Sequence, residues 1–157
     1  RSREWNEAES LEWYLLEWPT HAGLQAWVRD LNRIYKQEPA LYENDFDWNG
    51  YQWIEANDAE QSVLSYIRYA DDRSDFLVVL CNFTPVVRHN YRIGVPAAGT
   101  YRELLNSDSA HYGGSNVGNG GQLATEPVRW HAWDNSLLLT VPPLATLILK
   151  PVREDES

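Results

Sequence analysis

The aromatic side chains are the residues of this sequence best suited to form a binding site. Twenty of its 157 residues are Phe, Trp or Tyr, and eight of these are tryptophans. The electron-rich face of an indole suits the apolar C–H side of a sugar ring. Within Tyr51-Gln52-Trp53-Ile54, strand alternation would turn Trp53 to one face and Ile54 to the other. The segment is therefore a candidate sugar-stacking surface, and the alternative is that Trp53 packs in the core.

Carboxylates are plentiful, so composition alone does not exclude a catalytic pair of the glycosidase kind. Glu4, Glu7, Glu9 and Glu12 cluster, but on a short segment with no partner wall that could raise one pKa. A nucleophilic Ser or Cys is not indicated either, because Cys81 lies in an apolar run where a buried, inert thiol is expected. We therefore expect no catalytic residue in this chain.

Metal and phosphate sites are not indicated by the motifs. The four histidines and Cys81 lack the spacing of metal-ligand motifs, and the glycine-rich run 113–118 is not followed by a lysine. Asn82-Phe83-Thr84 matches a glycosylation sequence at the expected end of a strand, which we interpret as chance. The prediction is that the chain needs no cofactor and no metal.

Charge and length restrict the possible partners. The net charge of −10 argues against nucleic acid and against anionic membranes, which attract clustered Lys and Arg. No run approaches the ~20 apolar residues of a membrane helix, and a single cysteine fits a reducing compartment, so we expect a soluble, cytoplasmic protein. The chain has no methionine and begins with Arg1, which suggests a piece of a longer protein.

Residues 1–48 are predicted to be helix and loop. A helix over 21–36 would begin after Thr20 as its N-cap and end before Pro39. The charged residues Arg29, Asp30, Arg33 and Lys36 would cover the face opposite its apolar stripe. That stripe recurs at helical spacing and consists of Leu24, Trp27, Val28, Leu31, Ile34 and Tyr35.

From residue 49 onward the pattern changes to short strands separated by turn residues. Seven segments are rich in Val, Leu, Ile and Tyr, with no helical pattern between them, which indicates an antiparallel β-sandwich. The five glycines of 112–121 predict a long loop. We therefore divide the chain into a helical part, 1–48, and an all-β domain, 49–157. The predicted strands are 51–55, 62–69, 76–83, 90–95, 101–105, 136–141 and 145–150.

Several motifs along the whole chain resemble bacterial 1,4-α-glucan (glycogen) branching enzymes of the α-amylase superfamily. The block from Asn82 to Pro96 is the most specific for that family. The matching motifs include Arg3-Glu4-Trp5-Asn6, Ser10-Leu11-Glu12-Trp13, Cys81-Asn82-Phe83-Thr84-Pro85-Val86, Arg102-Glu103-Leu104-Leu105-Asn106-Ser107-Asp108, Tyr112-Gly113-Gly114-Ser115-Asn116 and Pro142-Pro143-Leu144-Ala145.

The resemblance implies that 1–48 is the helical tail of a (β/α)8 catalytic barrel and that 49–157 is an α-amylase-type C-terminal all-β domain. The catalytic carboxylates would lie on barrel strands outside this chain. The partners implied are an α-glucan (glycogen or a maltooligosaccharide) and the barrel of the same polypeptide. Glucan contacts are implied at Trp53, Tyr51, Trp5 and Asn6. Within such an enzyme this chain would have a structural role, stabilising one side of the barrel, with an auxiliary glucan site in addition. A free-standing carbohydrate-binding β-sandwich module remains the alternative.

Overall fold

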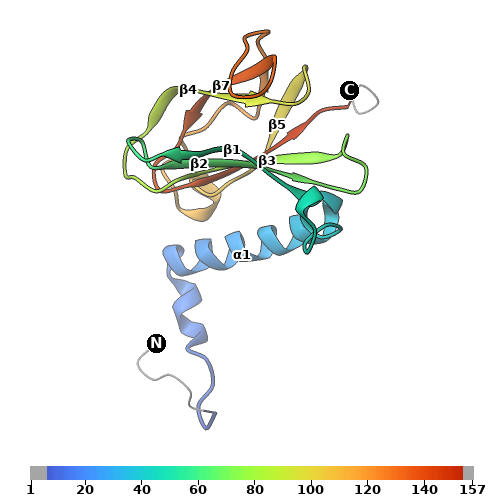
Figure 1. The fold of residues 1–157 in the computed structure, drawn as a ribbon. Coiled ribbons are helices and arrows are strands. Elements are labelled where there is room, and N and C mark those ends of the chain that lie inside the picture. The colour runs from blue at the N-terminus through green and yellow to red at the C-terminus, as the bar shows by residue number, and fades with distance from the viewer. Residues whose placement is uncertain (1–6, 154–157) are drawn as a thin grey trace.

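A computed structural model describes residues 7–153, which form two antiparallel β-sheets and one long helix (Figure 1). Six strands pair in the order β1-β2-β3-β8-β5-β6, and β4 pairs with β7 in a second sheet. This confirms the predicted β-sandwich with a helix before it. The strands are β1 (Tyr51–Asp58), β2 (Val63–Tyr69), β3 (Phe76–Asn82), β4 (Arg88–Val95), β5 (Thr100–Asn106), β6 (Gln122–Ala124), β7 (Asn135–Val141) and β8 (Thr146–Pro151).

All seven predicted strands are present, with ends that differ by three residues or fewer. The additional strand, β6, has only three residues and one large apolar side chain, Leu123, which is too little to stand out in the sequence. The glycine-rich segment is a loop, as predicted, and follows the short 3-10 helix η4 (Ala110–Tyr112). Asp108 fixes this loop by accepting hydrogen bonds from the backbone N–H groups of Ser115 and Val117, both at 2.9 Å.

The inner face of the six-stranded sheet packs against the β4–β7 sheet. Alternation along each strand supplies this core, as in β2, where every second residue from Val63 to Tyr69 is buried. The core contains Ile54, Val63, Ile67, Tyr69, Phe76, Val78, Leu80, Tyr91, Ile93, Val95, Tyr101, Leu137, Leu139, Val141, Leu147 and Leu149.

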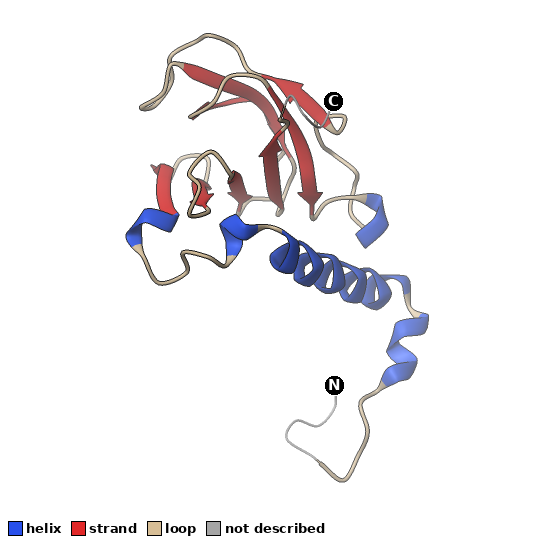
Figure 2. Ribbon diagram, turned by 90° about the vertical axis from the view of Figure 1, so that its right-hand side faces the viewer, coloured by secondary structure: helices blue, strands red, loops and turns tan. Residues whose placement is uncertain are grey.

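The outer face of the same sheet carries a second, smaller core. Leu77 and Val79 of β3 and Ile148 of β8 pack there against Ile34 of the helix and Ala40. Strand β3 is thus covered on both sides, which explains its continuous apolar run. Figure 2 shows the helix lying across this end of the molecule.

The helix α1 (Pro19–Gln37) begins earlier than the sequence predicts. Trp18 is its N-cap residue and Pro19 its first residue, so the prediction of Thr20 as the cap is wrong. Proline favours the first helical position, because that residue needs no N–H partner and its φ is already helical. The helix ends before Pro39, as predicted, and a 3-10 turn, η2 (Pro39–Leu41), follows.

The predicted apolar stripe of α1 does not pack as one surface. Trp27 and Ile34 contact the outer core, whereas Leu24, Val28, Leu31 and Tyr35 are exposed. The reason is that the side of α1 that contacts the β-domain carries Gly23 and Asp30 together with Trp27 and Ile34. A Cβ on Gly23 would lie 2.3 Å from the carbonyl oxygen of Tyr112, so only glycine allows this close approach.

The prediction that Asp30 lies on the solvent face is therefore also wrong. The Tyr112 hydroxyl donates a hydrogen bond of 2.8 Å to its carboxylate. Just after the C-terminal end of α1, Lys150 of β8 donates to the buried Glu38 and lies 3.5 Å from Asp75. Polar contacts thus hold the middle and the C-terminal end of the helix on the β-domain.

The segment before α1 extends away from the sandwich as a short 3-10 helix, η1 (Trp13–Glu17) (Figure 2). Together with the first turns of α1 it lines an apolar groove of about 410 Å³, in which Leu11, Trp13, Leu16, Leu24 and Val28 take part. Across residues 7–153, α1 included, no helix combines the length and apolar character that crossing a membrane requires.

Candidate functional site

Tyr51 and Trp53 lie on the outer face of β1, beside the surface that α1 covers. Trp53 is 49% exposed, whereas Ile54 is 8% exposed and belongs to the inner core. The predicted alternation is therefore confirmed, and the alternative that Trp53 fills the core is wrong. The antiparallel register places Trp53 directly opposite Tyr66 of β2, so β2 adds a third ring to the same face.

The three rings support one another. Tyr51 stacks on Tyr66 with ring centres 5.1 Å apart and an interplanar angle of 28°. Trp53 meets Tyr51 edge-on at 5.1 Å and 89°, and Tyr66 at 6.0 Å and 81°. Such geometry is favourable for aromatic pairs and holds the indole in one orientation. Burial raises the pKa of Tyr51 to about 12, so its hydroxyl remains a hydrogen-bond donor at neutral pH.

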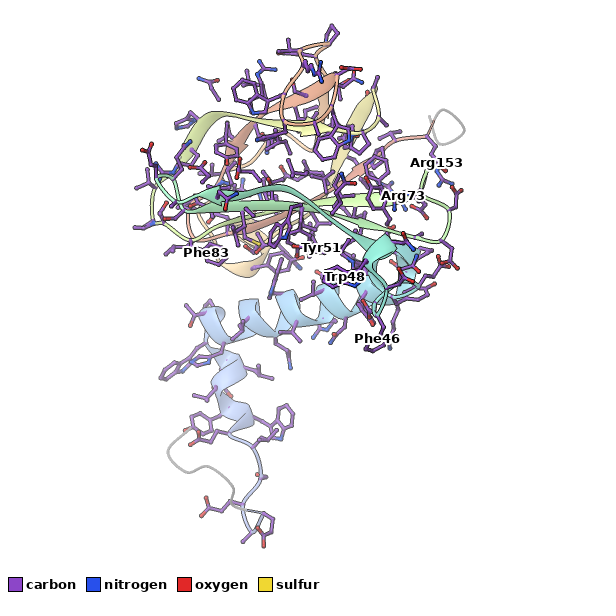
Figure 3. The ribbon with its side chains drawn as sticks, in the orientation of Figure 1. Phe46, Trp48, Tyr51, Arg73, Phe83 and Arg153 are labelled. Atoms are coloured by element: carbon purple, nitrogen blue, oxygen red, sulfur yellow. The ribbon has the colours of Figure 1, made fainter. Side chains whose placement is uncertain are left out.

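The loop before β1 extends this surface with two more aromatic residues. Phe46 and Trp48 are almost fully exposed and lie near the C-terminal end of α1, with Tyr51 above them (Figure 3). A cavity of about 370 Å³ separates this loop from β1 and is lined by residues 44–48, Tyr51 and Arg68. We call Phe46, Trp48, Tyr51, Trp53 and Tyr66 the aromatic surface.

Local interactions position the loop. Asp47 accepts a hydrogen bond of 2.8 Å from the backbone N–H of Asn49 and caps the turn η3 (Trp48–Gly50). Gly50 fits closely, since a Cβ there would lie 2.3 Å from the Asn44 carbonyl oxygen. Asp45 pairs with Arg68 at 2.6 Å, and this hydrogen bond is the largest cause that lowers the pKa of Asp45.

This arrangement suits the binding of a neutral sugar. Exposed aromatic faces can stack on sugar rings, and the side chains of Asn44, Asp47 and Arg68 offer both hydrogen-bond donors and acceptors beside them. Within residues 7–153, no three His, Cys, Asp or Glu side chains are grouped so that they could hold a metal ion.

The structure brings together two of the four predicted glucan contacts, Tyr51 and Trp53. The other two, Trp5 and Asn6, lie outside the described residues, as does Glu4. Sequence reasoning missed Tyr66, which pairing the first two predicted strands as a hairpin would have revealed. Sequence reasoning also missed Trp48, whose position in the turn before β1 leaves it exposed.

Asn82, the asparagine of the glycosylation sequence, is buried. Its side-chain N–H group donates to the carbonyl oxygens of Val86 at 2.8 Å and Pro142 at 2.9 Å, and its Oδ1 accepts from Thr84. The amide is thus fully used in joining three segments of chain, which supports the interpretation of the sequence match as chance.

Comparisons with known proteins give consistent matches. Residues 53–152 match the family described as Alpha amylase, C-terminal all-beta domain. A protein of Cereibacter sphaeroides named 1,4-alpha-glucan branching enzyme GlgB is 54% identical over 151 residues, which is 96% of this chain and 21% of that protein. A protein of the same name from Aromatoleum aromaticum is 53% identical over 98% of this chain and 24% of that protein. Another, from Methylobacillus flagellatus, is 50% identical over 96% of this chain and 21% of that protein. The chain spans about a fifth of the length of the curated relatives it matches.

Proposed function

Because the chain belongs to the family of alpha-amylase C-terminal all-beta domains, we propose that it is the C-terminal part of a 1,4-α-glucan branching enzyme. The observation that carries this proposal is the identity of 54% over 151 residues to a protein of that name. An alignment of that length cannot be contained within the matched β-domain, residues 53–152. It includes the helical segment as well, which a free-standing carbohydrate-binding module would not need.

In this proposal residues 1–48 are the tail of the catalytic barrel and residues 49–157 are the C-terminal domain. The exposed stripe of α1, formed by Leu24, Val28, Leu31 and Tyr35, supports the assignment. With the groove beside η1 it forms the kind of apolar patch that marks an interface in a soluble protein. The occupant that we propose is the barrel of the same polypeptide, because the relatives are about five times as long as this chain.

The parent reaction would cleave an α-1,4-linked glucan through a covalent glycosyl–enzyme intermediate and transfer the freed chain to a 6-hydroxyl group. This is the retaining route, with a sugar hydroxyl in place of water as the acceptor. The carboxylates that perform it would lie on barrel strands, and the reaction requires no cofactor or metal. The compartment would be the cytoplasm, where glycogen is the substrate and product.

The role of this chain would be structural, to cover and stabilise one side of the barrel, and in addition to hold glucan outside the active site. Trp53 supports this role best, since its indole is half exposed and already fixed by two neighbouring tyrosine rings. A sugar stacking there adds contacts without the entropy cost of ordering the side chain. Tyr51 would contribute its ring edge and hydroxyl, and Trp5 and Asn6 remain predicted contacts.

A domain exchange tests the proposal. The isolated chain should bind maltoheptaose but leave amylose unbranched in iodine-staining and reducing-end assays. When it replaces the corresponding 151 residues of the Cereibacter sphaeroides protein, which it matches at 54% identity, branching should be retained. The same protein truncated before this segment should be inactive. A folded exchange protein without branching activity, or branching by the isolated chain, would contradict the proposal.

A further inference from the structure

A second cavity, of about 560 Å³, lies at the opposite end of β1 and is lined by residues of β1, of β4 and of the turn that carries Trp130 and His131. Its lining includes Glu55, Asp58, Arg92, Trp130 and His131, and none of the residues of the aromatic surface. Its volume is within the range of roughly 300–1,000 Å³ that is usual for small-ligand sites. We call it the sandwich pocket.

Two β-bulges in β1 direct carboxylates into the sandwich pocket. The register shifts between Trp53 and Glu55, so that Glu55 pairs with the buried Ser65 and points to the inner side of the sheet. A second shift follows before Asp58, which reaches the hydroxyl of Tyr91 on the other sheet. Bulges of this kind re-aim side chains and are frequent beside functional sites. Regular alternation would have kept Glu55 on the outer face.

Hydrogen bonds hold both carboxylates in place. Asp58 accepts from the Tyr91 hydroxyl at 2.8 Å and from the backbone N–H of Gln61 at 3.1 Å. Glu55 accepts from the backbone N–H of Asn57 at 2.6 Å. A carboxylate has about four lone-pair positions, so each group can accept further hydrogen bonds from a ligand.

The opposite wall is built around Gly94 of β4. Its backbone N–H donates to Nδ1 of His131 at 3.1 Å, and a Cβ there would lie 2.1 Å from the Trp130 carbonyl oxygen. The backbone of Trp130 also pairs with that of Trp133, whose side chain packs on the inner core. These contacts hold the turn against β4, and the Trp130 side chain, 45% exposed, forms part of the wall.

His131 contributes a neutral donor to this wall. Burial is the main cause that lowers its pKa, so the imidazole is uncharged at neutral pH. Since Nδ1 accepts the Gly94 N–H, the proton is on Nε2, which lies 3.6 Å from the Glu55 carboxylate. The sandwich pocket therefore offers donors, acceptors and an aromatic face together.

The chemistry of the lining selects the class of ligand. An anion would meet Glu55 and Asp58, and the charge of Arg92 is already paired with Glu126 at 2.6 Å, whereas the hydroxyl groups of a neutral sugar can donate to both carboxylates. Metal binding is not indicated, because the described residues contain no group of three or more suitable ligands. We propose that the sandwich pocket binds a neutral sugar unit, which stacks on Trp130 and donates hydroxyl hydrogen bonds to Glu55 and Asp58.

The identification of that sugar as a glucose unit of an α-glucan rests on the proposed function. The test is a titration of the isotope-labelled 157-residue chain with maltoheptaose, followed through the indole N–H signals of Trp53 and Trp130. We expect saturable shifts at both residues. In Trp130→Ala the affinity at the sandwich pocket, followed through the backbone N–H signal of Gly94 because the indole is gone, should fall about fivefold or more, as for the loss of one stacked ring, with an unchanged shift at Trp53. Trp130→Tyr should retain part of the binding.

The other possible results of this titration distinguish the sandwich pocket from the glucan site at Trp53. Shifts at Trp53 alone would overturn the sandwich pocket and leave the proposed function intact. Shifts at Trp130 alone would support the sandwich pocket and overturn the glucan site at Trp53. If maltoheptaose does not shift the Trp130 signal, the proposed sugar site in the sandwich pocket is overturned. A Trp130 shift with a lysine-rich peptide, and none with maltoheptaose, would also overturn it. A matched control, Trp13→Ala, removes an exposed tryptophan of η1 and should leave both signals unchanged.

Discussion

The two faces of the six-stranded sheet have the same strands behind them but different covers. The inner face is sealed by β4 and β7 over its whole apolar surface. The outer face is divided: α1 covers β3 and β8, while the aromatic residues of β1 and β2 beside it remain partly or largely exposed. Aromatic rings occur on both faces, as with Tyr101 inside and Trp53 outside.

Burial, and not residue type, therefore separates the aromatic residues of the core from those that we propose to bind glucan. A buried ring loses its contacts when it is truncated and leaves a cavity behind. An exposed ring that neighbours already hold in place loses little stability and has a face free for a ligand. The part of the outer face that α1 covers is an intermediate case, because the packing of the helix there depends on a few close contacts. Substitutions in the three regions should therefore have graded effects.

The largest effect is expected on the inner face. Tyr101 is fully buried, its hydroxyl donates to the Ala97 carbonyl oxygen at 3.0 Å, and its ring packs near Phe76. Tyr101→Ala should lower the free energy of unfolding by about 3–5 kcal/mol, as measured by urea denaturation. Phe83→Ala, at an exposed ring, is the control and should change it by less than about 1 kcal/mol. Equal losses of unfolding free energy in the two variants would contradict the distinction between buried and exposed rings.

The helix-covered region should show an intermediate effect. Gly23→Ala would raise helix propensity by about 1 kcal/mol in a free helix. Here the new methyl group meets the Tyr112 carbonyl oxygen, so the substitution should instead weaken docking by about 1–3 kcal/mol.

Hydrogen exchange of residues 19–37 measures this effect, because undocking exposes the amides of α1 without unfolding the sandwich. Asn32→Ala is the matched control at an exposed position of the same helix and should leave or slightly improve protection. Improved protection in Gly23→Ala would mean that the close contact does not hold the helix.

A smaller, pH-dependent effect should arise from Asp30 and Tyr112. Their hydrogen bond is the largest cause that lowers the pKa of Asp30. A carboxyl group with a lowered native pKa stabilises the folded state fully above its unfolded pKa of about 3.9, and this contribution is lost as the pH falls through the lower native value.

Tyr112→Phe should therefore weaken helix docking by about 1 kcal/mol at neutral pH. The difference in stability between the variant and the parent chain should become smaller below about pH 4, because Asp30 becomes protonated there. Unfolding curves at pH 7, 4 and 2.5 would measure this difference in the free energy of unfolding. A difference that stays constant down to the lowest pH would show that the charge of Asp30 plays no part.

Sequence reasoning predicted the inner face well, because strands covered on one side alternate and β3, covered on both, does not. The same alternation put Trp53 and Ile54 on opposite faces, and the structure places Trp53 outward and Ile54 inward. Continued to Glu55, the alternation would point this side chain outward, but a bulge that has no marker in the sequence turns it inward.

The outer face was predicted poorly. An apolar stripe indicates which residues of a helix avoid water but not which of them meets the neighbouring sheet. For α1 the docking direction depends on a missing side chain, Gly23, and on a polar contact between Asp30 and Tyr112, which lie 82 residues apart. Such long-range contacts leave no local periodicity, so the exposure of the stripe became visible only in the fold, as did the addition of Phe46, Trp48 and Tyr66 to the aromatic surface.

The most direct test of the account is the substitution Trp53→Ala, with maltoheptaose binding and melting temperature measured on the same samples. One stacked ring contributes on the order of 1 kcal/mol, so the parent chain should bind at about millimolar Kd and the variant about fivefold more weakly. The melting temperature should remain within about 3 °C of the parent chain, because the indole is half exposed. Trp13→Ala should change neither quantity. Unchanged binding in Trp53→Ala, or weaker binding together with a melting temperature lowered as far as in Tyr101→Ala, would contradict the account.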